Sequence, residues 1–65
     1  MKEVSRTELE AVIDQWIMNS RNRRIAKRKL IDGIRFEELA EEFDLSVRWV
    51  KEIVRAARMT IERHI

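Results

Sequence analysis

Apolar residues recur at helical spacing in four stretches of the chain, and charged residues fill the positions between them. The first stretch places Leu9, Val12, Ile13, Trp16 and Ile17 at i, i+3, i+4, i+7 and i+8, which is the pattern of an amphipathic helix with a wide buried stripe. The other stretches repeat this period, and none shows the alternation of a strand. The sequence therefore predicts an all-α, four-helix domain over residues 1–65, with helices at about 6–19, 22–31, 36–43 and 46–63.

Capping residues set the expected ends of these helices. Ser5 and Thr7 are each followed three positions later by a glutamate, so either one fits a capping box at the start of the first helix. Gly33, the only glycine, follows the second helix, where a C-terminal cap often needs a positive φ. Ser46 is expected to cap the last helix.

The last two helices are joined by a tight turn, Asp44-Leu45-Ser46. Aspartate tolerates the left-handed conformation that such a turn needs. This layout is typical of a helix-turn-helix, whose second helix enters the DNA major groove. The last helix, however, continues its apolar stripe to Ala57 and Ile61, further than that motif requires. Helix one or a dimer partner is expected to cover the excess.

Two tryptophans are interpreted as packing residues. Trp16 lies on the stripe of the first helix, which favours a core anchor over a ligand-binding or base-stacking role. Trp49 is either a partly buried clamp against the preceding basic helix or an exposed apolar contact, and burial is the favoured interpretation.

Charge is distributed unevenly, although the net charge is only +2. Residues 20–35 carry seven basic side chains against one acid, Asp32; an acidic stretch with five carboxylates follows, and residues 46–65 are basic again, five to two. A basic run on a helix with so few apolar positions indicates phosphate contact for part of it. The alternative is a purely solvated or acid-paired face.

Composition excludes several classes of site. The 65 residues contain no cysteine and a single histidine, His64, so no disulfide and no thiolate or histidine-cluster metal site is expected. No glycine-rich phosphate loop or nucleophile–base pair supports catalysis, so neither an enzyme nor a cofactor is expected. The longest uncharged run, Gln15–Ser20, is too short to span a membrane, and no apolar signal segment opens the chain. We expect a soluble cytosolic protein that is stabilised by helix packing, self-association or both.

Residues 33–54, GIRFEELAEEFDLSVRWVKEIV, resemble the helix-turn-helix of the promoter-reading C-terminal domain of bacterial sigma factors and of related small phage and bacterial regulators. The resemblance spans about residues 22–61, and helix one has no counterpart in it. Asp44 stands where that family usually has a turn glycine, and Arg35 where it has Ser or Thr. The resemblance implies a DNA-binding regulator of transcription. Its matching positions are Gly33, Phe36, Glu38, Leu39, Ala40, Phe43, Leu45, Ser46, Val50 and Ile53.

A last helix inserted in the major groove would present its first exposed positions to the bases. Arginine and lysine donate to guanine, glutamate accepts from cytosine, and valine contacts a thymine methyl. Double-stranded DNA is the expected partner, with a possible homodimer through helix one and the C-terminal helix, and RNA polymerase as a possible protein partner. The expected base contacts are Ser46, Val47, Arg48, Lys51, Glu52 and Arg55, and the expected phosphate contacts are Arg24, Arg28 and Arg35.

Two other functions fit the same pattern. The chain could be a helical interaction module that binds protein through the acidic helix 36–43 or through the apolar stripe of helix one. It could also be a self-associating four-helix unit in which the last helix is occluded.

Overall fold

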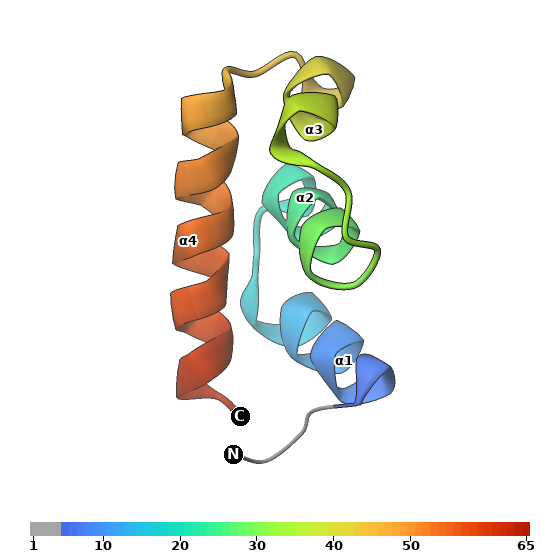
Figure 1. Cartoon of the computed structure of the whole chain (residues 1–65). Helices are drawn as coiled ribbons and strands as arrows, with labels where there is room; N and C mark the ends of the chain where they lie inside the picture. Colours follow the sequence, from blue (N-terminus) through green and yellow to red (C-terminus); the bar gives the residue numbers. More distant parts are fainter. Residues whose placement is uncertain (1–4) are drawn as a thin grey trace.

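Four helices form the fold in a computed structural model that describes residues 5–65. Helix α1 spans Arg6–Trp16, α2 spans Ser20–Leu30, α3 spans Phe36–Phe43 and α4 spans Val47–Arg63. Figure 1 shows α1, α2 and α3 stacked along one side of the long α4. The described part of the chain contains no strand, which confirms the predicted all-α, four-helix class. Residues 1–4 of the predicted domain lie outside the described residues.

Side-chain caps explain where the first two helices begin. Ser5 Oγ accepts a hydrogen bond of 3.1 Å from the backbone N–H of Glu8, so the predicted cap at Ser5 is confirmed. Asn19 caps α2 in the same way, accepting from the N–H of Asn22 at 3.1 Å. Because asparagine is a strong N-cap, α2 begins at Ser20, earlier than predicted, and α1 ends at Trp16 instead of extending to residue 19.

Two residues with positive φ set the turns around α3. Gly33 has the predicted positive φ of 72° and lies two residues beyond Ile31, the C-cap of α2. Asp44 ends α3 in the left-handed conformation at φ 55° and ψ 48°. Ser46 Oγ then accepts from the N–H of Trp49 at 3.0 Å and starts α4. The predicted bounds of α3 are therefore confirmed, and α4 ends at the predicted residue but begins at Val47, one residue after Ser46, its N-cap.

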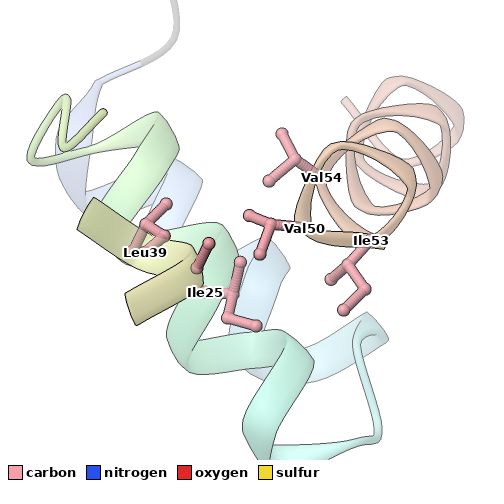
Figure 2. Close-up of a cluster of buried hydrophobic side chains, with 6 residues drawn as sticks. Ile25, Leu39, Val50, Ile53 and Val54 are labelled. Carbon is pink, nitrogen blue, oxygen red and sulfur yellow. The ribbon is translucent and has the colours of Figure 1, made fainter. Parts of the chain in front are cut away.

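The first core cluster lies at the helix-turn-helix. Side chains from α2, α3 and α4 converge there, as Figure 2 shows, and Ile25, Leu39 and Val50 have no exposed surface. Leu45 packs against the cluster from the turn. The buried members are Ile25, Leu39, Ala40, Val50, Ile53 and Val54.

The second core cluster joins α1 to the far half of α4. Ile13 and Ile17 pack there with Ala26 of α2 and with Ala57 and Ile61 of α4. The part of the α4 stripe that extends beyond the helix-turn-helix is thus covered within the chain, by the helix that the sequence indicated for this role.

Both tryptophans differ from their predicted burial. Trp16 is 42% exposed and stacks on His64 with ring centroids 3.7 Å apart, and Trp49 is 51% exposed. Isoleucines and alanines fill the contact between α1, α2 and α4, and Trp16 is not a member of that cluster. Trp49 precedes the buried Val50 in α4, so it lies about 100° round the helix from that residue. Neither is a core residue.

We predict opposite effects for substitutions at the two positive-φ residues. A Cβ at Gly33 would meet no atom within 4 Å, so Gly33→Ala should lower the free energy of unfolding through backbone strain alone, by about 1 kcal/mol. Asp44→Gly relieves the same kind of strain and should leave that free energy unchanged or raise it by up to about 1 kcal/mol. Urea unfolding followed by circular dichroism measures both values. A destabilisation by Asp44→Gly as large as that by Gly33→Ala would contradict this explanation of the turns.

Candidate DNA-binding surface

The exposed side of α4 carries most of the predicted base-contacting residues. At 100° per residue, Arg48, Glu52 and Arg55 lie about 140–160° from Val50, on the side opposite the core. All three are exposed, as are Ser46 and Lys51. Val47 differs, because it is half-buried and packs against the first core cluster. Five of the six predicted base-contacting residues therefore lie on an accessible surface.

Basic residues of α4 differ from those of the other helices in their ion pairs. Within residues 5–65, ion pairs to carboxylates involve Arg6, Lys27, Arg28 and Arg35, and none involves the five basic residues of α4. An unpaired surface cation keeps a mobile counterion atmosphere that phosphate can replace. The cations of α4 are thus available to an anionic partner without breaking an intramolecular contact.

The ring of Phe36 brings a lysine of α2 next to α4. Lys29 Nζ lies 4.2 Å from the ring centroid and Lys51 Nζ lies 5.6 Å from it, both within cation–π range. Arg35 precedes Phe36 and is the N-cap of α3, where it donates a 3.2 Å hydrogen bond to Glu38. These contacts extend the basic surface of α4 across the start of α3.

Two members of this surface were absent from the predicted contacts. Arg58 is exposed and lies seven residues after Lys51, so helical spacing alone places it on the same flank of α4. Lys29 could not be found in that way, because its position depends on how α2, α3 and α4 pack together. We call Lys29, Arg35, Arg48, Lys51, Arg55 and Arg58 the basic surface.

Arg24 and Arg28, by contrast, are not brought to the basic surface. The guanidinium of Arg24 lies 5.4 Å from the ring centroid of Phe43, and Arg28 pairs with Glu42 at 2.8 Å while its Nε is buried. Both line a hollow of about 260 Å³ formed by α1, α2 and the residues just after α2, and no α4 residue lines it. Both arginines thus pack against α3 and not against α4, and their contact with phosphate stays a prediction.

Glutamates of α3 are divided between two environments. Glu38 and Glu42 neutralise Arg35 and Arg28. Glu37 and Glu41 are exposed, and no ion pair within residues 5–65 includes them. Their charge lowers the local positive potential beside α4, and it also forms a second, acidic feature on the same helix.

No group of three or more potential metal ligands occurs among the described residues. No helix in residues 5–65 combines the length and the apolar character needed to cross a bilayer.

Comparison with known proteins gives no match: no protein-family model, curated protein sequence or solved structure matches the chain. The resemblance to the sigma-factor domain therefore rests on the residues quoted for it and stays a prediction.

Proposed function

We propose that the chain is a sequence-specific, double-stranded-DNA-binding protein that inserts the first turns of α4 into the major groove. We further propose that it acts in the cytoplasm as a small sigma-like or phage-type regulator of transcription, by binding and not by catalysis. The observation that supports DNA binding most directly is the set of basic residues on α4. All five are exposed, and none has an intramolecular carboxylate partner among residues 5–65.

Base contacts follow from the chemistry of the exposed positions. Arg48 and Lys51 would donate to guanine O6 and N7, and Glu52 would accept from cytosine N4. Arg55, two turns after Arg48 on the same side, would reach the next part of the site. Ser46 Oγ already accepts from a backbone N–H, so its hydroxyl proton is what remains to donate to a base.

Phosphate contacts are assigned to the rest of the basic surface. Lys29 and Arg35 lie beside the start of α3, and Arg58 lies on the α4 flank that carries Lys51. Such contacts fix the register of the protein on the duplex and give the affinity its dependence on salt. Arg35 keeps 76% of its side chain exposed, so its pairing with Glu38 is weak enough to exchange for phosphate.

A protein partner is the second candidate, and the acidic feature of α3 supports it. Glu37 and Glu41 are exposed and unpaired within residues 5–65, so a basic surface, for example on RNA polymerase, would complement them. This binding could accompany DNA contact or replace it. The apolar stripe of helix one gives less support, because Ile13 and Ile17 are buried against α2 and α4.

Arg48→Ala should weaken binding to the preferred duplex by about 1–3 kcal/mol, or roughly 5–150-fold in the dissociation constant. The reason is the loss of a bidentate contact to guanine. Fluorescence anisotropy with a duplex selected from a random-sequence library measures the change. Arg24→Ala removes the same charge on the outer face of α2 and serves as the matched control, with an expected change below about twofold. A larger effect of Arg24→Ala than of Arg48→Ala would mean that DNA contacts α2 and not α4, and would contradict the proposal.

Salt should weaken duplex binding steeply. Three phosphate contacts give a slope of about −2.7 in log K against log salt, or roughly a 40-fold loss between about 50 and 200 mM. Lys29→Gln should make the slope shallower by about one contact while leaving the preferred sequence unchanged. If the protein keeps its helical circular dichroism but binds no duplex at about 50 mM salt, the proposed function is wrong.

A further inference from the structure

A groove without charged residues lies between α4 and the segment that joins α1 to α2. Its volume is about 270 Å³, and none of its nine lining residues is charged, in a chain where 40% of residues are. Trp16, Ile17 and Met18 line one side, and Ile53, Ala56 and Thr60 of α4 line the other. We call this surface the uncharged groove.

Large apolar side chains project beside this groove. Met18 is 80% exposed and Trp16 is 42% exposed. Trp49, at 51% exposure, lies four residues before Ile53 and so continues the same flank of α4. Apolar surface left in water costs about 25 cal/mol per Å², so a cluster of this kind favours association with a matching surface.

We propose that the uncharged groove pairs with the same groove of a second copy of the chain to form a two-fold homodimer. A charged partner surface would lose its hydration against a groove that offers no counter-charge. Within this chain the longest uncharged run is Gln15–Ser20, and it contributes residues to the groove itself. Within this chain, the surface that best matches the groove of one copy is therefore the same groove of a second copy. An isologous interface requires such a self-matching surface.

Shape and charge agree with self-pairing. Each copy presents a protruding Met18 next to a hollow, so a two-fold axis would place each methionine against the hollow of the other copy. Ala56 is the smallest side chain on this flank of α4, so two antiparallel α4 helices would approach most closely there. Trp49 and Arg63 each lie seven positions from Ala56, so the indole of one copy would face the guanidinium of the other in a cation–π contact.

The size of the molecule limits the strength of this dimer. A stable interface buries about 800 Å² per partner, about one sixth of the 4921 Å² accessible surface of the chain. The groove has nine lining residues, fewer than the roughly 20–30 residues that each side of such an interface contributes. We therefore expect reversible association in the micromolar range.

This surface differs from the one that the sequence predicted for a homodimer. The stripes of helix one and of the C-terminal helix pack on each other within one chain, through Ile13, Ile17, Ala57 and Ile61. The uncharged groove lies beside that contact and leaves it intact.

The dimer would also set the geometry of DNA contact, a consequence that rests on the proposed function. Ser46 lies ten residues from Ala56, so the two copies would begin α4 about 30 Å apart at 1.5 Å per residue. That is close to the 34–36 Å between successive major-groove sites. Arg48 and Arg55 lie about 80–100° round α4 from Ala56, so a two-fold axis would direct both copies to the same side.

Sedimentation equilibrium without DNA, from micromolar to millimolar protein, tests the dimer by itself. Wild type should pass from the 7.9 kDa monomer to twice that mass. Ala56→Glu and Met18→Glu should each raise the dimer dissociation constant at least about tenfold, because they place a carboxylate in the uncharged groove. Ala11→Glu, at an exposed position of α1 outside the groove, is the matched control and should not change it.

Circular dichroism establishes that each variant is folded, and both substituted groove positions are exposed in the monomer. A wild-type mass of 7.9 kDa up to millimolar concentration would overturn the proposal and leave the groove to a different partner. The proposal would also be overturned if the Ala56→Glu and Met18→Glu variants had the same dimer dissociation constant as the Ala11→Glu variant. Because no DNA is present, neither result bears on duplex binding. Binding of the monomeric Ala56→Glu variant to a duplex with a single half-site tests that function separately.

Discussion

One buried stripe along α4 holds the other three helices together. Val50 and Val54 close the cluster with α2 and α3, and Ala57 and Ile61 close the cluster with α1 and α2. A chain of 65 residues buries only about 60% of the surface that it exposes when unfolded, so it has little stability to lose. A rotation of α4 about its axis would break both clusters at once. The stripe therefore fixes which sides of α4 face outward, and the positions of the basic surface and of the uncharged groove depend on it.

The sides of α4 that remain outside the stripe have different chemistry. On one flank the helix presents Lys51, and the ring of Phe36 in α3 adds Lys29 beside it. Arg58 lies two turns further along the same flank. On the other flank Ala56 belongs to the uncharged groove. Because these surfaces are separated round the helix, an anionic partner and an apolar partner could bind at the same time. The caps at Ser46 and the turn at Asp44 keep the start of α4 in a fixed position relative to α3.

Much of the fold follows from local rules, so the sequence was enough to predict it. Helical period and capping chemistry predict the α3 bounds and the whole α4 stripe, because both depend on neighbours within one or two turns. The sequence did not predict the exposure of Trp16 and Trp49. The helical period shows on which side of a helix a residue lies, but not how much of that side a neighbouring helix covers. For the same reason the sequence did not show that Arg24 lies over the ring of Phe43 or that Arg28 pairs with Glu42. The position of Lys29 beside α4 could not be predicted, because it depends on how α2, α3 and α4 pack together.

In the proposed function, the exposed side of α4 contacts DNA and the outer face of α2 does not. A ¹⁵N–¹H NMR titration of the protein with a short duplex tests it directly, because each backbone amide reports its own surroundings. We expect the largest shift changes at Arg48, Lys51 and Arg55, with smaller ones near Arg35, and little change at Lys27. Changes concentrated on the Lys27 face of α2 with α4 unaffected would contradict the account.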